Sequence, residues 1–187
     1  MRLNLGCGNR KLPGWVNVDM SPGCHLDQLV DLEQIPWPWP DDSVEEVPLS
    51  HVLEHLGRTT AVYLDIFKEL YRVCADGAKV TIIVPHPRHD FFLNDPTHVR
   101  AVTPEGLAHF SRKINQKWIS DGAANTPLAV CLAIDFDIVG TKYALEEPWF
   151  GRAQRGQISK AELDQAVRQF NNVVTQTAVE LKAVKEK

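Results

Sequence analysis

Hydrophobic residues form short runs and helically spaced groups that alternate along most of the chain. The short runs are typical of buried strands, and they occupy Arg2–Leu5, Val16–Asp19, Val44–Ser50 and Lys79–Val84. Between Thr59 and Asp76 the apolar residues recur every three or four positions, which predicts a helix that Gly77 stops. Another helix is predicted to begin at Thr103, and one or two strands are predicted within 129–143. Strands that alternate with helices indicate an α/β domain with a mainly parallel sheet.

A different pattern occupies the last part of the chain. Ser159 and Glu162 have the spacing of a capping box, and the apolar residues that follow alternate intervals of four and three. This seam predicts a long C-terminal helix, and its members are Leu163, Val167, Phe170, Val174, Thr177, Leu181 and Val184. We therefore expect a domain at 1–150 and a helical extension at 151–187. The 159–187 helix either lies on the domain or pairs with a second copy in a homodimer.

Composition narrows the class of protein. A chain of 187 residues with 44% apolar residues suits one domain with one core. A net charge of −4 and a pI of 6.0 argue against a general nucleic-acid binder, although a local site for tRNA or rRNA remains open. No apolar run approaches the roughly 18 residues of a membrane span, and the first strand begins too early to leave room for a signal peptide. We expect a cytoplasmic protein with four reduced cysteines and no membrane partner.

The first nineteen residues carry the main candidate for a ligand site. Gly6 and Gly8 directly follow the first strand, and glycine lets a ligand approach the backbone because it has no Cβ and tolerates positive φ. Asp19 ends the second strand, where a carboxylate can accept both hydroxyls of a ribose. Ligands of parallel sheets bind beyond the carboxyl ends of the strands. The sequence therefore predicts a nucleoside-cofactor site, with Asp31 and Ser50 at the same edge of the sheet.

With these residues in place, the chain resembles the class I S-adenosylmethionine-dependent methyltransferases, in particular small bacterial members that open LNLGCGN…GWVNVD. The similarity covers residues 2–110, and the stretch 95–105 also looks like loops of this family. Four pieces occur in the family's order, namely Leu3–Asn9, Val16–Asp19, Asp31–Trp39 and Ser50–Leu56, which reads SHVLEHL. The resemblance implies a Rossmann-like, mainly parallel sheet with flanking helices. It also implies an enzyme that transfers a methyl group from S-adenosylmethionine to an acceptor.

The resemblance further implies roles for individual residues. The cofactor-binding set is Gly6, Cys7, Gly8, Asn9, Asp19, Met20, Asp31, Leu32, Ser50 and His51. In this set the glycine-rich backbone would face the methionine end and the ribose, and Asp19 would hold the ribose hydroxyls. Met20, Asp31 and Leu32 would border adenine. Ser50 and His51 would border the methionine moiety and the transferred methyl group.

The polar loop 85–102 supplies the candidates for a catalytic base. Histidine titrates near neutral pH, so it suits proton transfer or metal binding. The candidates are His98, His86, His89 and Asp95, of which His98 is preferred because it lies in the part of the loop that resembles the family. We expect the acceptor to be a small molecule or a glycan or lipid precursor, because the negative charge disfavours DNA and bulk RNA.

Two other functions remain open. The family usually has an acid where Asn4 stands and a glycine where Asn9 stands, and the first crossover, 6–15, is short. These departures favour a non-catalytic subunit that acts through its C-terminal helix. The run from His51 to His55 also matches HxxEH, the inverted zinc-protease pattern. It directly follows a strand, where the methyltransferase resemblance accounts for it, so a zinc hydrolase is a distant alternative and we assign no metal ligands.

Overall fold

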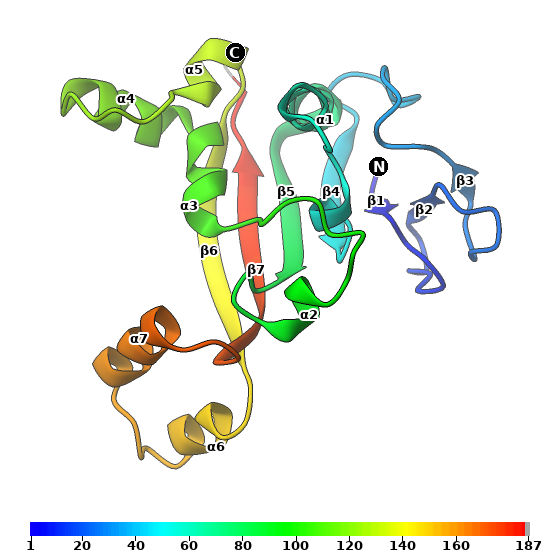
Figure 1. Ribbon diagram of the computed structural model, residues 1–187. Helices are drawn as coiled ribbons and strands as arrows, with labels where there is room; N and C mark the ends of the chain where they lie inside the picture. The colour runs from blue at the N-terminus through cyan, green and yellow to red at the C-terminus, as the bar shows by residue number, and fades with distance from the viewer. Residues whose placement is uncertain (186–187) are drawn as a thin grey trace.

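The computed structural model describes residues 1–185 and contains one seven-stranded sheet with the order β3-β2-β1-β4-β5-β7-β6 (Figure 1). The strands are β1 (Leu3–Leu5), β2 (Val16–Asp19), β3 (Gln28–Leu29), β4 (Val44–Ser50), β5 (Cys74–Pro85), β6 (Phe136–Leu145) and β7 (Val174–Ala183). Strands β1 to β5 pair in parallel, whereas β7 is antiparallel to both β5 and β6. The prediction of an α/β fold with a mainly parallel sheet is confirmed.

The helices all follow β4 in the chain. They are η1 (Leu53–His55), α1 (Thr60–Val73), α2 (Asp90–Leu93), α3 (Pro104–Leu107), η2 (Ala108–Phe110), α4 (Arg112–Ser120), α5 (Leu128–Leu132), α6 (Trp149–Gln154) and α7 (Lys160–Gln169). Thr59 and Thr103 accept the capping hydrogen bonds of α1 and α3, at the positions that the sequence predicts. Within residues 1–185, no helix has the length and apolar character needed to cross a bilayer.

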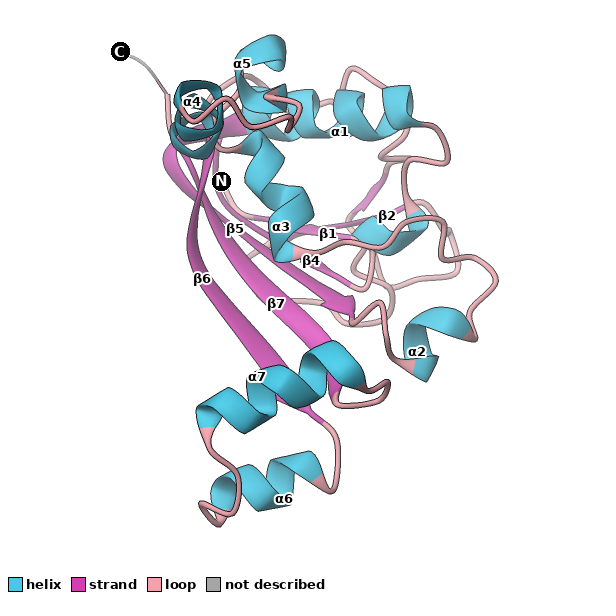
Figure 2. Cartoon of the chain, turned by 60° about the vertical axis from the view of Figure 1, so that its left-hand side comes forward, coloured by secondary structure: helices cyan, strands magenta, loops and turns pink. Residues whose placement is uncertain are grey.

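The core lies on one face of the sheet. Alternate strand residues such as Val80, Ile82 and Leu181 are fully buried, whereas their neighbours Lys79 and Lys182 are exposed. Figure 2 shows α3 and α7 in front of the sheet. On the buried side, the aromatic residues of α1, η2 and β6 pack together, with Phe67 and Phe110 stacked at 3.8 Å between ring centroids. The polar residues that alternate with these buried ones lie on the opposite face, as expected for a sheet with one solvated face.

The sheet half that contains β1, β2 and β3 has connections without helices, since residues 1–52 contain none. The connection from β3 to β4 is instead fixed to α1 by side chains. Arg72 donates to the carbonyl oxygens of Trp37 and Trp39 and to the carboxylate of Glu69. Trp37 and Trp39 are buried and meet edge to face, so they are core residues. These contacts leave the carboxyl ends of β1 and β2 open to ligands.

The long C-terminal helix is the main error of the sequence prediction. The capping box at Ser159 and Glu162 is present, but the helix ends at Gln169 and residues 174–183 form strand β7 between β5 and β6. Burial in this segment follows the alternation of a strand and not the predicted helical seam. The buried residues of β7 are Val174, Thr177, Val179, Leu181 and Ala183. Part of the predicted extension therefore belongs to the sheet. The helical seam that motivated a homodimer, or a subunit docked through this helix, does not exist beyond Gln169.

Candidate functional site

A cavity lies at the point where the strand order reverses, between β1 and β4. Open α/β sheets bind ligands at this position. The cavity has a volume of about 300 Å³ and lies beyond the ends of β1, β2 and β4. Its lining residues are Gly6, Gly8, Asp19, Met20, Val30, Leu32, His51, Val52, His55 and Leu56. The wall is mostly apolar, with one carboxylate and two imidazoles as its ionisable groups.

The backbone at Gly6 requires glycine for two independent reasons. Its φ is +66°, in the left-handed region that L side chains rarely adopt. A Cβ at this position would also lie 2.2 Å from Cγ2 of Val52, so Val52 occupies the space that a side chain would need. Gly8 has a φ of +49° with open space around it. The turn after β1 therefore presents bare backbone to the cavity.

Asp19 organises this turn through its carboxylate. Oδ2 accepts a hydrogen bond from the Gly8 N–H at 2.8 Å, and Oδ1 accepts one from the Ser21 N–H at 2.9 Å. A carboxylate has about four acceptor positions, so each oxygen keeps one for a ligand donor. The half-buried Asp19 side chain can thus fix the glycine turn and still accept two hydroxyl groups.

Asn4, where the family usually has an acid, has a local structural role. Its Nδ2 donates to the side-chain oxygen of Asn17 at 2.9 Å and to the carbonyl oxygen of Arg10 at 3.0 Å. A carboxylate cannot donate either bond. The amide therefore holds the short connection between β1 and β2, which has no helix of its own.

The structure brings together most of the predicted cofactor residues and leaves four outside the cavity. Gly6, Gly8, Asp19, Met20, Leu32 and His51 line it, whereas Cys7, Asn9, Asp31 and Ser50 do not. The Cys7 N–H donates to Val18, and burial together with nearby Asp19 raises the pKa of the Cys7 thiol. Asp31 accepts from the Glu33 N–H at 2.9 Å, as in a turn.

Four lining residues were missed by sequence reasoning, namely Val30, Val52, His55 and Leu56. Three of them lie in the SHVLEHL stretch, so the motif contained a signal that was assigned only to its first two residues. His51 has a φ of +57°, and three of the residues that follow it, Val52, His55 and Leu56, line the cavity. Contact with Glu54 raises the pKa of His51, whose Nδ1 lies 3.5 Å from Glu54 Oε1.

The catalytic candidates fall into different environments. His89 is buried, its Nε2 lies 2.7 Å from a carboxylate oxygen of Glu146, and its Nδ1 accepts from the Phe91 N–H. Both ring nitrogens are thus occupied, and His89 fixes the start of α2. His86 Nδ1 accepts from the Arg88 N–H at 3.2 Å, and burial and Arg88 lower the pKa of His86. Neutral His86 therefore carries its proton on Nε2 and has no free lone pair.

His98 differs because its lone pair is free. Its Nδ1 lies 2.8 Å from the carbonyl oxygen of Phe92, so Nδ1 carries the hydrogen and Nε2 carries the lone pair. The ring centroids of His98 and His55 are 4.6 Å apart, and His55 lines the cavity. The carboxylate of Asp95 is 3.7 Å from His98 Nε2, which is too long for a hydrogen bond. Among the four candidates, His98 has the geometry that best suits a base.

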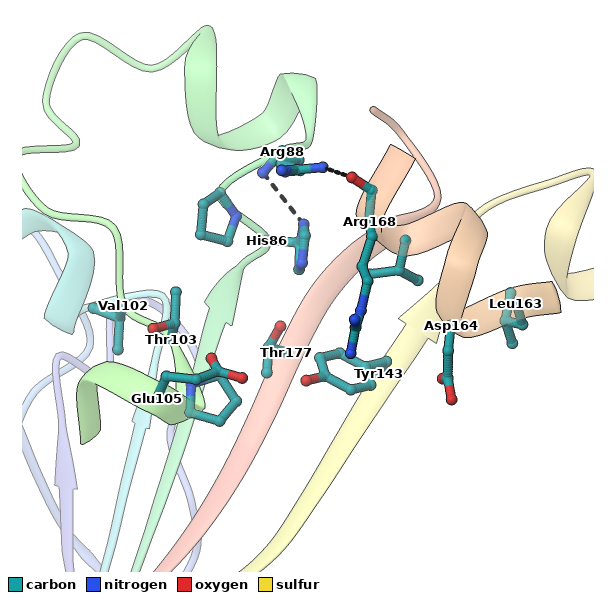
Figure 3. A pocket seen from close by; sticks show the side chains of 13 residues that line it. His86, Arg88, Val102, Thr103, Glu105, Tyr143, Leu163, Asp164, Arg168 and Thr177 are labelled. Atoms are coloured by element: carbon teal, nitrogen blue, oxygen red, sulfur yellow. Dashed lines mark hydrogen bonds between the residues drawn. The ribbon is translucent and has the colours of Figure 1, made fainter. Parts of the chain in front are cut away.

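A second cavity of about 460 Å³ lies between β6, β7, α3 and α7 (Figure 3). His86, Glu105, Tyr143, Asp164 and Arg168 contribute polar or charged atoms to its wall. Both signs of charge occur there, so the cavity suits a polar ligand. It is separate from the first cavity, since the two share no lining residue.

The HxxEH segment does not have the arrangement of a zinc protease. Glu54 and His55 lie on the short 3₁₀ helix η1, whereas His51 precedes it in a left-handed conformation. The zinc-protease pattern needs both histidines on one helix. His51 Nε2 instead lies 3.2 Å from the side-chain oxygen of Gln176 on β7.

Comparison with solved structures identifies the fold. A SAM-dependent methyltransferase from Archaeoglobus fulgidus superposes with a TM-score of 0.59 at 18% identity, covering 97% of this chain and 85% of that one. A second, from Mesorhizobium loti, gives 0.52 at 15% identity, covering 97% and 89%. The [4+2]-cyclase SpnF gives 0.57 at 12% identity, covering 99% and 75%. No protein-family model and no curated protein matches the sequence. The chain thus has the Rossmann-like fold of these methyltransferases, which also supports other chemistry.

Proposed function

We propose that the protein is a methyltransferase that uses S-adenosylmethionine. The observation that carries the proposal is the cavity at the reversal of strand order, where Asp19 and the bare glycine turn face the same space. A nucleoside needs an acceptor for its ribose hydroxyls, an apolar slot for its base and room near the backbone. The lining of this cavity offers all three.

Each part of the cofactor has a matching part of the wall. Asp19 would accept the ribose hydroxyls through its free acceptor positions. Met20, Val30 and Leu32 supply an apolar surface for adenine. His51 and His55 come from the segment after β4 and would border the methionine moiety.

The chemistry asks little of the protein beyond binding and orientation. The sulfonium cofactor supplies a reactive methyl group, and the residues of the chain align the acceptor with it and exclude water. His98, with its free Nε2, is the candidate to accept a proton from the acceptor. The acceptor we propose is a small molecule or a glycan or lipid precursor, and the polar cavity of Figure 3 is large enough to bind part of it.

Binding of S-adenosylhomocysteine to the purified chain tests this function. The ligand should raise the unfolding temperature by mass action. Asp19→Ala should weaken its Kd at least tenfold, about 1.4 kcal/mol. Asp121→Ala is the matched control, because Asp121 is an exposed aspartate outside the cavity and its loss should leave the Kd unchanged. Absence of binding to the wild type at millimolar ligand, or equal Kd values for wild type and Asp19→Ala, would refute the proposal.

A further inference from the structure

Three potential metal ligands meet at the rim of the cofactor cavity. Glu54 and His55 come from η1, and His98 comes from the loop that follows α2. One ligand atom from each of the three residues lies within 4.8 Å of the others. The cluster is adjacent to the cavity because His55 belongs to its lining.

The carboxylate of Glu54 is the unusual member of this cluster. The residue is 0% exposed, and neither of its carboxylate oxygens has a hydrogen-bond partner. The nearby Nδ1 of His51, at 3.5 Å from Oε1, is too distant for a good hydrogen bond. Buried carboxylates are normally hydrogen-bonded, paired or bound to a metal, and the loose ion pair with His51 leaves Glu54 without a hydrogen bond. The Glu54 side chain therefore keeps both oxygens free of hydrogen bonds and can bind a cation.

The two imidazoles are oriented as metal ligands. Thr97 donates its hydroxyl hydrogen to Asp95 Oδ1 at 2.6 Å, so its oxygen must accept the hydrogen of His55 Nδ1 at 2.9 Å. The Nδ1 of His98 donates to the carbonyl oxygen of Phe92 at 2.8 Å. Both rings thus hold a lone pair on Nε2, and both are fixed by the outer hydrogen bonds that metal-ligating histidines usually make.

We propose that Glu54, His55 and His98 bind one divalent transition-metal ion of the Zn²⁺ type. Two imidazole nitrogens with a carboxylate form a known ligand set for zinc and related ions. In a tetrahedral site, bond lengths of roughly 2.0–2.2 Å place ligand atoms about 3.4 Å apart. Side-chain rotations would bring the three ligand atoms, which lie within 4.8 Å of one another, to that spacing. Asp95, whose Oδ2 is 3.7 Å from His98 Nε2, lies close enough to become a further ligand.

The site gives the proposed methyltransferase a way to choose its acceptor. This role rests on the proposed function, because the ion would lie beside the cavity assigned to S-adenosylmethionine. An open coordination position would bind an oxygen of the acceptor, such as a hydroxyl or carboxylate. The lone pair of His98 then belongs to the metal, so His98 positions the acceptor through the ion and does not act as a base.

Metal titration of the full chain tests the site without any cofactor. The protein is stripped with a chelator and titrated with Zn²⁺ or Co²⁺ by calorimetry and absorption. We expect one ion per chain, and His98→Ala and Glu54→Gln should each weaken the Kd at least tenfold. His25→Ala is the control, because His25 is an exposed histidine outside the cluster. Mg²⁺, which prefers oxygen ligands, should not compete.

Thermal unfolding of the metal-free proteins separates binding from folding. Glu54→Gln removes a carboxylate that is buried without a hydrogen-bond partner, so the unfolding temperature of the variant should equal or exceed that of the wild type, while stabilisation by Zn²⁺ is lost. Equal Zn²⁺ affinity in wild type, His98→Ala and Glu54→Gln would overturn the proposal. A cobalt–thiolate absorption band would also overturn it, since the ion would then be on a cysteine.

Binding of S-adenosylhomocysteine to the same metal-free wild type keeps the two proposals apart. If this ligand fails to bind while the metal titrations behave as expected, the methyltransferase function fails and the metal site stands. If the ligand binds while the variants and wild type take up Zn²⁺ equally, the metal site alone fails.

Discussion

Gly6 is the residue at which backbone and packing constrain the site most closely. Gly6→Ala combines a left-handed backbone with a Cβ contact of 2.2 Å to Val52, so it must displace a wall of the cavity. We expect a loss of at least 2 kcal/mol in stability, roughly the sum of φ strain and overpacking, together with loss of S-adenosylhomocysteine binding. Chemical denaturation and calorimetry measure the two effects.

Gly14→Ala is the matched control for this substitution. Gly14 also has a positive φ, of +78°, but nothing lies within 4 Å of its would-be Cβ and it does not line the cofactor cavity. It should lose about 1 kcal/mol from backbone strain alone and bind the ligand normally. Equal losses in the two variants would show that Val52 yields easily and that the steric argument is wrong.

For single residues, the sequence predicted which residue types occur at the strand ends better than it predicted their hydrogen-bond partners. The placement of Gly6 and Asp19 at one cavity was predictable because both lie at the carboxyl ends of parallel strands, which meet at the same edge of the sheet. The absence of Asp31 from the cavity lining was not predictable, because its carboxylate instead accepts the Glu33 N–H in a local turn. Likewise, the free lone pair of His98 depends on how the loop folds back to the carbonyl oxygen of Phe92, and the occupied Nε2 of His89 depends on the distant Glu146.

Among the elements, α1 carries a pH-sensitive contact. Hydrogen bonds from Arg72 lower the pKa of Glu69, which also accepts the Trp37 N–H at 2.7 Å. A lowered pKa in the folded state stabilises the protein above the unfolded value, near 4.5, and this contribution is lost as the pH falls through the folded value. Glu69→Gln should therefore cost about 1 kcal/mol at pH 7, allowing for partial exposure.

The measurement is unfolding free energy against pH. The difference between wild type and Glu69→Gln should narrow as the pH falls below about 4.5. Glu45→Gln, at an exposed position on β4, should change neither the free energy nor its slope. A constant difference from pH 7 to pH 3 would mean that the lost stability is packing and not charge.

Strand β7 shows why the C-terminal element was mispredicted. Apolar residues spaced alternately by four and three positions fit one face of a helix. Residues four positions apart also share one face of a strand, so the spacing alone does not distinguish the two. The β-branched residues Val173, Val174 and Thr175 favour a strand, and pairing with β5 and β6 decides between the two. Only the capping box, a local feature, was reliable there.

Val179 and Phe170 distinguish strand from helix by experiment. Val179 is buried in β7 but lies outside the helical seam, whereas the seam residue Phe170 is 53% exposed. Val179→Ala should cost about 2 kcal/mol, from two methyl groups and a residual cavity. Phe170→Ala should cost under roughly 0.5 kcal/mol, as expected of an exposed site. If urea denaturation showed a larger loss of stability for Phe170→Ala than for Val179→Ala, the long C-terminal helix would be the better description of this segment.

The two halves of the sheet differ in the length of their strands and in the cavity that each half carries. The half with β1, β2 and β3 has strands of three, four and two residues and connections without helices. The half with β5, β6 and β7 has long strands and carries the larger polar cavity. Short strands have few ladder hydrogen bonds, so we infer that the half with β1, β2 and β3 opens more easily in the free protein and gains most from a ligand.

Hydrogen exchange with and without S-adenosylhomocysteine tests this division. Protection should rise in segments 5–9, 18–21, 30–32 and 51–56, which surround the smaller cavity, because the ligand joins the ends of three strands. Segments 103–106 and 162–168, around the larger cavity, should be unchanged until an acceptor is added. Protection confined to the larger cavity would move the cofactor to the other half of the sheet. It would also reduce the glycine turn and Asp19 to structural features.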